Sequence, residues 1–497
     1  MNHWIMIPLL LPLVGGMANL LLVGRPGYQR LVSLLTTLAL LPVTILLLLD
    51  ADGGEMLIYQ LGNWPAPFGI SLVLDRLSGM LLVLTATLAL PALLAATAGD
   101  DRLGENFHIL FPLQLFGING AFLTGDLFNL FVFFEVMLIA SYGLALHGGG
   151  RERVRAGLHY VVLNLIGSSL FLVAIGTLYG IAGTLNMADL AVYMTSAPVE
   201  QMTLLRVAAL LLLIVFALKA AVLPLHLWLP ALYSAGTAPV AALFAIMTKV
   251  GVYAILRTFT LILPTAGPFS DVSPVLELVA LLTLGVGAIG ALASRRLTVL
   301  IAYLVIVSVG TLLAGIALFS VPGLTAVLFY LPHTTLITAG LFLLADLIAG
   351  RRGMAGDELQ SVAPSPGNLT GGLFFLAAVA VAGMPPLAGF LGKLLLLQAA
   401  PPGQVVWIWS VVLVGSLAVV VALSRAGSNL FWRTEDEAIK QPVISLRLAM
   451  PTILLLATTV ALTLWAAPVT RYAEATAIQL LHPQETIKAV LGREVNR

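Results

Sequence analysis

Apolar runs about as long as a bilayer is thick follow one another along almost the whole chain. A helix needs roughly 20 mostly apolar residues to cross the hydrocarbon layer, and fourteen such segments alternate with polar or Gly/Pro-rich connections. They lie at 2–23, 31–49, 76–97, 108–124, 127–146, 159–182, 204–233, 239–262, 273–293, 298–318, 322–348, 370–400, 406–431 and 448–467. No connection is long enough for a soluble domain, so we expect helices packed within a membrane.

The composition supports the same class. Of 497 residues, 60% are hydrophobic and only 9% are charged, whereas soluble domains carry charges at about a quarter of their positions. We therefore predict an all-α polytopic membrane protein with 14 transmembrane helices. The polar tail from about residue 468 indicates an interfacial amphipathic helix. The chain has no cysteine, which excludes disulfides, thiolate metal sites and cysteine nucleophiles.

The positions of Lys and Arg predict the orientation, because cytoplasmic connections of membrane proteins retain these residues. With the N-terminus outside, fourteen basic residues fall in cytoplasmic connections and seven at external ends or in the tail. The cytoplasmic group comprises Arg25, Arg30, Arg102, Arg151, Arg153, Arg155, Arg295, Arg296, Arg351, Arg352, Arg425, Arg433, Lys440 and Arg447. The external group comprises Arg76, Arg206, Arg257, Arg471, Lys488, Arg493 and Arg497. This bias predicts that both termini lie on the outer side.

The remaining basic residues are Lys219, Lys249 and Lys393, and each lies deep within a predicted span. Glu135 is the one acid near the middle of a span. A charge at membrane depth costs about 2.5 to 3.5 kcal/mol even on the mildest scale. Lysine, unlike arginine, changes its protonation readily when it is removed from water. The four residues therefore favour proton transfer, with static pairing that holds helices together as the alternative.

Two of these lysines lie beside predicted helix breaks. In LKAAVLP (218–224) Lys219 precedes Pro224, and in GMPPLAGFLGK (383–393) Lys393 follows Pro385 and Pro386. Proline removes a backbone donor, and the carbonyls that it frees in a bilayer need polar partners or water. Paired interrupted helices in the two halves of a transporter point to its ion site.

Histidines are further candidates for proton relays, because their unperturbed pKa is close to physiological pH. His333 lies within a span, in FYLPHTTLITAGLFL, and is predicted to be a relay residue. His226 follows the first break and is a possible accessory residue that could relay protons or fill space. His108 and His147 are predicted to be surface or loop residues.

Motifs for other chemistry are missing from the sequence. The glycine-rich GGGRER (148–153) lacks the GK[ST] of a nucleotide-binding loop. The chain has neither zinc-ligand spacing nor a nucleophile elbow. We therefore predict no catalytic residue, no metal site, no cofactor and no nucleic-acid partner. A carrier, a channel or a pump module remains.

Several of these segments resemble a known family. The stretch from Leu218 to Arg257, together with GMPPLAGFLGKLLLL (383–397), is similar to the proton-translocating antiporter-like subunits. These subunits occur in respiratory complex I, in membrane-bound hydrogenases and in Mrp-type multi-subunit cation/proton antiporters. DLFNLFVFFEVMLIASYGL (126–144) and SAGTAPVAALFAIMTKVGVYAILR (234–257) most resemble the D-type component of the Mrp-type Na⁺/H⁺ antiporters.

The resemblance implies an architecture of two inverted five-helix repeats. They would cover 106–265 (helices 4–8) and 270–435 (helices 9–13). Three helices would precede them in 1–105, and helix 14 with the tail would follow in 436–497. One helix in each repeat would be broken.

The resemblance also implies roles for individual residues. Glu135 corresponds to the acid of the fifth helix, which tunes the lysine of the seventh, Lys219. Lys249 corresponds to the central relay of the eighth helix, His333 to the histidine of the eleventh and Lys393 to the lysine of the twelfth. Two positions depart from the family pattern. Leu304 occupies a position where a hydroxyl is expected, and Thr338 one where many relatives have a second lysine.

The leading hypothesis is a proton-translocating subunit of a bacterial antiporter in the inner membrane, exchanging H⁺ for Na⁺ or K⁺. Its partners would be the lipid bilayer and the other subunits of a hetero-oligomeric complex. It would be an ion-transport subunit and not an enzyme. A proton-pumping subunit of complex I or of a membrane-bound hydrogenase is the first alternative. A stand-alone solute transporter and an assembly subunit with purely structural charges are the others.

Overall fold

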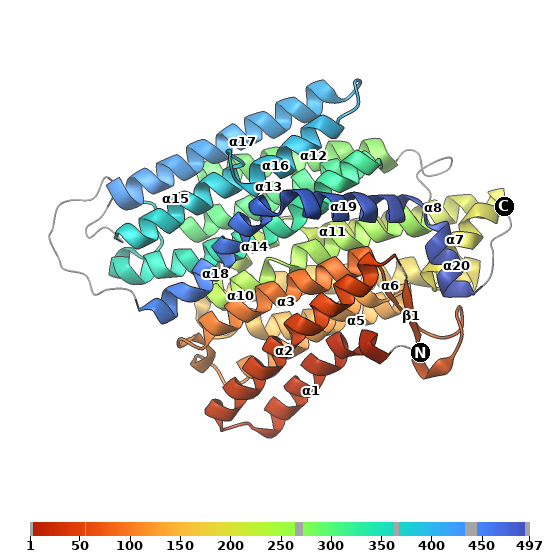
Figure 1. Cartoon of the computed structure of the whole chain (residues 1–497), viewed down its shortest axis with the longest axis horizontal. Helices are drawn as coiled ribbons and strands as arrows, with labels where there is room; N and C mark the ends of the chain where they lie inside the picture. Colours follow the sequence, from red (N-terminus) through yellow and green to blue (C-terminus); the bar gives the residue numbers. More distant parts are fainter. Residues whose placement is uncertain (1–2, 55, 264–271, 362–366, 433–444, 493–497) are drawn as a thin grey trace.

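The computed structural model describes residues 3–54, 56–263, 272–361, 367–432 and 445–492. Its helices run side by side and form one elongated bundle (Figure 1). Within these residues, twelve helices are long and apolar enough to cross a membrane. They are α1 (Ile7–Leu21), α2 (Pro26–Asp52), α3 (Arg76–Ala96), α5 (Leu127–Ala145), α6 (Arg151–Ala182), α8 (Met202–Ala220), the joined α10 (Ala238–Phe244) and α11 (Met247–Arg257), α12 (Val272–Ala293), α13 (Leu297–Ala317), α14 (Val321–Arg352), α17 (Val405–Gly427) and α18 (Leu446–Leu464).

Shorter helices complete the bundle. The apolar ones are α4 (Phe107–Leu123), α15 (Asn368–Ala382) and α16 (Ala388–Ala399). The others are α7 (Met187–Ser196), α9 (Trp228–Ala235), α19 (Ala466–Leu481) and α20 (Gln484–Leu491), besides single turns such as η1 (His3–Met6), η3 (Asp100–Arg102) and η5 (Thr258–Ile262). Every predicted span overlaps helix, so the class of all-α polytopic membrane protein is confirmed. The count of fourteen crossings stays a prediction.

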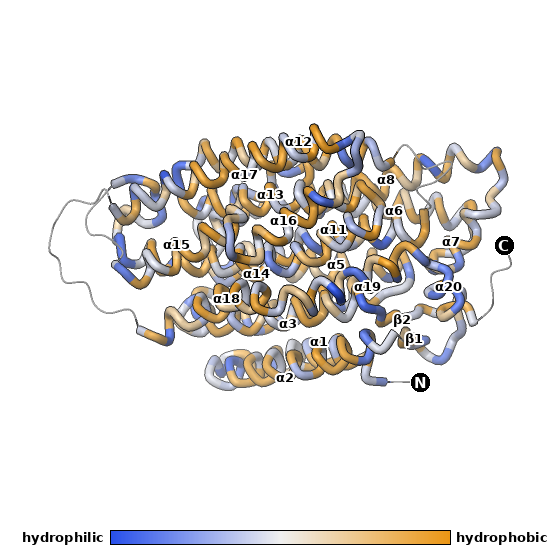
Figure 2. Tube along the Cα trace, turned by 45° about the horizontal axis from the view of Figure 1, so that its top comes forward, coloured by the Kyte–Doolittle hydropathy of each residue, from blue (hydrophilic) through white to orange (hydrophobic). Residues whose placement is uncertain are grey.

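The structure adds one small sheet that the hydropathy pattern did not reveal. Strands β1 (Leu57–Gln60) and β2 (Ser71–Leu74) pair antiparallel between α2 and α3, with Leu57 opposite Leu74. They lie at the end of the bundle that also holds η1 and α20 (Figure 1). Hydrophobic residues cover the helix shafts, while hydrophilic residues gather toward the ends of the bundle (Figure 2).

The C-terminal tail packs differently from the expectation. Instead of only lying at an interface, α19 continues from α18 after Trp465 and packs along α14. Its buried residues include Ala473, Ala477 and Leu480, spaced for one helix face. The basic residues Arg433, Lys440, Arg493 and Arg497, and the repeat boundaries at 265, 270, 435 and 436, lie outside the described residues.

A buried ion pair ties the N-terminal helices to α11 at the η1 end. The guanidinium of Arg257 donates to both carboxylate oxygens of Asp75, at 2.6 and 3.0 Å. Asp75 also caps α3 by accepting from the backbone N–H of Ser78 at 2.9 Å. Arg257 was predicted at an external span end, and it lies at one, but only 5% of it is exposed.

A second polar cluster lies where α2 and α4 begin. Arg30 donates to Asp101 at 2.5 and 2.6 Å, and His108 Nε2 contacts the same carboxylate at 3.0 Å. Burial raises the pKa of Asp101, but the hydrogen bonds from Arg30 and His108 outweigh it and hold that pKa below its ordinary value.

The prediction that His108 and His147 are surface residues is wrong. They are 4% and 7% exposed, because each has a buried polar partner that a hydropathy pattern cannot reveal. His108 contacts Asp101, and the Nε2 of His147 donates to the carbonyl of Asp100 at 2.7 Å.

Asp75→Asn is expected to lower the free energy of unfolding by about 3 kcal/mol, because it leaves the Arg257 charge buried without its counter-ion. Asparagine retains the helix cap, so the loss isolates the ion pair. Asp50→Asn, at an exposed position of α2, is the matched control. Thermal unfolding of the purified complexes measures both, and equal midpoints would contradict the assigned role of the pair.

Candidate functional site

Helix α6 joins the predicted acid and lysine of the first half. Lys219 Nζ donates to Asn164 Oδ1 at 2.9 Å, and Ser168 Oγ donates to Glu135 Oε1. Asn164 and Ser168 are four residues apart on α6 and therefore lie on one face. In the described part of the chain no ion pair links Lys219 to Glu135 directly. The two charges are connected through a pair of neutral side chains.

The first break lies at the end of α8, as the proline predicted. The helix ends at Ala220, Ala221 adopts a left-handed conformation with φ of 59°, and α9 begins at Trp228. The indole N–H of Trp228 donates to the freed carbonyl of Leu218 at 3.1 Å. On the other side of the break, the backbone N–H of Leu223 donates to Thr283 Oγ1 of α12 at 3.1 Å. The break is thus stabilised by a residue of the second half.

Pro224 and His226 lie within this interrupted segment. Pro224 is exposed, whereas His226 is 5% exposed. Among the described residues the Nδ1 atom of His226 has no hydrogen-bond partner. The accessory role of His226 stays a prediction.

Lys249 lies in α11 beside a bend that the sequence did not predict. The bend separates α10 from α11 at Ala245 and Ile246, although neither residue is Pro or Gly. The Tyr233 hydroxyl of α9 donates to the carbonyl of Phe244 at 2.5 Å. A side chain that takes a carbonyl out of the helical ladder produces such bends.

Lys249 itself is fully buried and reaches into the second half. Its Nζ donates to Ser308 Oγ of α13 at 3.2 Å. Two residues further along α11, Gly251 allows close contact with α8. A methyl group at Gly251 would lie 2.5 Å from the backbone N of Ala220. The helix of Lys249 thus touches α8 immediately after Lys219.

The second break places Lys393 at the end of a helix. Between α15 and α16, Pro385 and Pro386 interrupt the helix, and Lys393 Nζ donates back to the carbonyl of Ala382 at 2.8 Å. It also donates to Ser416 Oγ of α17 at 3.0 Å. An ammonium group there meets the partial negative charge of the α15 C-terminus.

His333 lies in α14 against α16, with 1% of its surface exposed. Neither ring nitrogen has a hydrogen-bond partner of normal geometry among the described residues. A methyl group at Gly389 would lie 2.7 Å from His333 Nε2 and 2.0 Å from the carbonyl of Ala380. Glycine is therefore required for α16 to approach this imidazole.

Hydroxyl groups connect Lys249 to His333. Ser308, the partner of Lys249, is one turn from Thr311 on α13. The Tyr330 hydroxyl interacts with the side chains of Thr311 and Thr334, and its ring centroid lies 5.9 Å from that of His333. These groups fill the space between the two predicted relay residues.

The two departures from the family pattern have a structural explanation. Leu304 is buried, and the hydroxyl of Ser308, one turn along α13, contacts the lysine instead. The hydroxyl of Thr338 donates to the carbonyl of Thr334 in its own helix. Among the described residues, no group of three or more His, Asp or Glu side chains could hold a metal ion.

Sequence reasoning missed the neutral partners of the charged residues, which are Asn164, Ser168, Thr283, Ser308, Thr311, Tyr330 and Ser416. Their only signal is a polar side chain within an apolar span. Such residues frequently bond to their own helix, so the signal alone does not identify them.

Interrupted membrane helices that carry buried lysines on polar partners define the class of ion-translocating membrane subunits. The chain belongs to the NADH:quinone oxidoreductase/Mrp antiporter transmembrane family, whose pattern matches residues 124–419. The matched segment contains Glu135, Lys219, Lys249, His333 and Lys393.

The chain is similar to two named relatives over nearly its whole length. The D-type component of a probable K⁺/H⁺ antiporter of Rhizobium meliloti (strain 1021) is 40% identical, over 99% of this chain and 98% of the relative. The D-type component of a Na⁺/H⁺ antiporter of Alkalihalophilus pseudofirmus is 36% identical, over 99% and 100%. A chain in the structure of the Mrp complex from Dietzia sp. DQ12-45-1b superimposes with a TM-score of 0.87 at 29% identity, covering 99% of this chain and 100% of that one.

Gly389→Ala is expected to destabilise the protein by about 1 to 3 kcal/mol, since the new methyl group overpacks the contact between α16, Ala380 and His333. Gly372→Ala is the matched control, because nothing lies within 4 Å of a methyl group there, in α15 of the same broken helix. Removing a helical glycine at an open position stabilises by about 0.5 to 1 kcal/mol. Thermal unfolding should therefore shift in opposite directions for the two variants, and a shared direction would contradict the close contact.

Proposed function

We propose that this chain is the proton-translocating subunit of a multi-subunit monovalent cation/proton antiporter. The observation that carries the proposal is the arrangement of three buried lysines, each on its own neutral partner, along elements that contact one another across both halves. The relatives are named as components of K⁺/H⁺ and Na⁺/H⁺ antiporters, which supports exchange of protons for K⁺ or Na⁺. Its partners would be the other subunits, and it would transport ions without being an enzyme.

Protons would pass along the chain of groups described above. Lys219 would take a proton from Glu135 through Ser168 and Asn164, and would pass it to Lys249 across the contact at Gly251. From Lys249 the path would continue past Ser308 and Tyr330 to His333 and then to Lys393. Water would bridge the intervals that exceed hydrogen-bond length. Lysine suits this role because its flexible stem lets one ammonium group reach alternative partners.

The packing of glycines supports two repeats in this subunit. In α4 a methyl group at Gly117 would meet Met137, and one at Gly120 would meet Phe133. The same contacts recur about 170 positions later in α12 and α13, at 287 against 307 and at 290 against 303. Equal spacing in both pairs supports repeats at 106–265 and 270–435 between the flanking segments 1–105 and 436–497.

Two features support a location in the bacterial inner membrane with both termini outside. The first and last described helices, η1 and α20, lie at the same end of the bundle (Figure 1). Basic residues from separate predicted cytoplasmic connections share one cavity of about 560 Å³, which Arg151, Arg153 and Arg296 line together. Their common position agrees with the positive-inside rule.

A redox-driven proton pump is the second candidate, because the family description names NADH:quinone oxidoreductase beside the Mrp antiporter. The same relay residues would serve there, with a different driving reaction in other subunits. The genes beside this one distinguish the two, since only a redox complex requires cofactor-binding partners. A stand-alone transporter of organic solutes would be active without partners.

Lys219→Ala should reduce cation-driven proton exchange by about a hundredfold, the scale that a positioned proton-transfer group contributes. Everted vesicles that carry the whole complex would be challenged with Na⁺ or K⁺ while proton movement is recorded. Rates would be compared at matched amounts of complex. The control is Asn119→Ala, which removes a buried hydrogen bond to the carbonyl of Pro8 outside the relay.

Undiminished exchange per complex in Lys219→Ala would make the lysine structural and would contradict the relay. A lower amount of complex with a normal rate per complex would favour the assembly role instead.

A further inference from the structure

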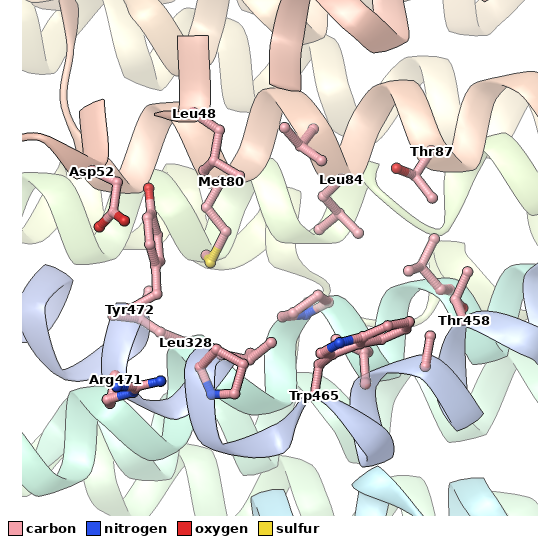
Figure 3. Close-up of a pocket in the computed structure, with 17 residues that line it drawn as sticks. Leu48, Asp52, Met80, Leu84, Thr87, Leu328, Thr458, Trp465, Arg471 and Tyr472 are labelled. Carbon is pink, nitrogen blue, oxygen red and sulfur yellow. The ribbon is translucent and has the colours of Figure 1, made fainter. Parts of the chain in front are cut away.

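A cavity of about 690 Å³ lies away from the relay residues, between the N-terminal helices and the C-terminal pair α18–α19 (Figure 3). Its walls are apolar and include Met80 and Leu84 of α3, Leu328 of α14 and Trp465 after α18. Nothing in the proton relay uses this space.

The cavity is polar at one end only. Asp52, Arg471 and Tyr472 lie together at one end, and the small residues Thr87 and Thr458 lie at the other (Figure 3). The rim is held in place, since Arg76 lies 3.6 Å from the Asp52 carboxylate and its carbonyl accepts from the Tyr472 hydroxyl at 2.8 Å. Arg471 is exposed at this rim.

The length of the cavity matches one leaflet of a bilayer. Its polar end is level with the start of α3 at Arg76, and its far end is at Thr87. These eleven residues of helix span about 16 Å at 1.5 Å each, close to half of the roughly 30 Å hydrocarbon layer. The charged end therefore lies at headgroup depth and the far end near the midplane.

The size of the cavity excludes a helix as its occupant. A helix with its side chains is at least about 10 Å across, so two turns occupy roughly 850 Å³. The cavity holds about 690 Å³. It fits a slender apolar chain with a polar head, and its rim offers a cation to a phosphate.

We propose that this cavity binds one phospholipid from the leaflet at the η1 and α20 end of the bundle. The phosphate lies against the guanidinium of Arg471. One acyl chain runs past Met80 and Leu84 toward Thr87, over the face of α14 that Leu328, Pro332 and Leu336 present.

The bound chain has a structural consequence for α14. Pro332 lines the cavity, and the next residue, His333, packs on the opposite side against Gly389 of α16. The acyl chain and α16 thus hold the same turn of α14 from two sides. The lipid takes the place of a packing element that the polypeptide does not supply.

Native mass spectrometry of the intact complex, titrated with dioleoylphosphatidylglycerol after delipidation, tests the proposal. Arg471→Gln should weaken lipid binding about tenfold, because a charge-assisted hydrogen bond to phosphate is lost. Met80→Trp should abolish binding by filling the apolar part of the cavity. The controls are Arg155→Gln, at an exposed arginine at the opposite end of the bundle, and Leu417→Trp, at an exposed leucine of α17. Both controls should bind lipid as the wild type does.

Equal lipid binding in all five proteins would overturn the proposal, as would retention of detergent or inorganic phosphate without phospholipid. A photo-crosslinker in place of Leu84 that captures another subunit would also overturn it, by identifying a polypeptide occupant. If Met80→Trp lowers the yield of complex, Arg471→Gln decides, because its exposed rim position does not support the fold.

Discussion

The cost of a charge in a low-dielectric membrane governs how this chain uses its ionisable residues. At the ends of the bundle, arginines pair with carboxylates, as Arg257 does with Asp75 and Arg30 with Asp101. Such pairs are fixed, because removing either charge leaves the other unpaired. The deeper lysines instead donate to an amide, hydroxyls and a backbone carbonyl. A neutral acceptor stabilises an ammonium group without requiring it, so each lysine can lose its proton and leave no orphaned counter-ion.

The two broken helices solve the same backbone problem in different ways. In the first, Trp228 satisfies the freed carbonyl, so Lys219 is free to bond to α6. In the second, Lys393 itself satisfies the carbonyl of Ala382. The repeats also differ at the acid, because the glycine register that relates them aligns Glu135 with Val305. We infer that the two halves contribute unequally, with the tunable acid–lysine pair confined to the first.

The sequence was sufficient for features that act through strong, local rules. Long apolar runs gave the helices, prolines gave the two breaks, and the cost of burying charge singled out Lys219, Lys249 and Lys393. The bend beside Lys249 was not predictable, because the hydroxyl that causes it comes from Tyr233 in another helix. His108 was assigned to the surface for a related reason, since its partner Asp101 becomes adjacent to it only through packing. Partners chosen by tertiary contact leave no periodic signal.

Helix α14 connects the separate parts of this arrangement. It has 32 residues and at 1.5 Å per residue extends about 48 Å, longer than the hydrocarbon layer. One of its turns carries His333, and nine residues later Phe342 packs on Tyr233 with ring centroids 5.9 Å apart. Tyr233 in turn holds the bend beside Lys249. Because packed interiors shift between discrete arrangements and do not deform smoothly, a displacement of α14 at His333 is transmitted to that bend. We infer that α14 links the central lysine to the second half mechanically, in addition to the hydroxyl groups that link them chemically.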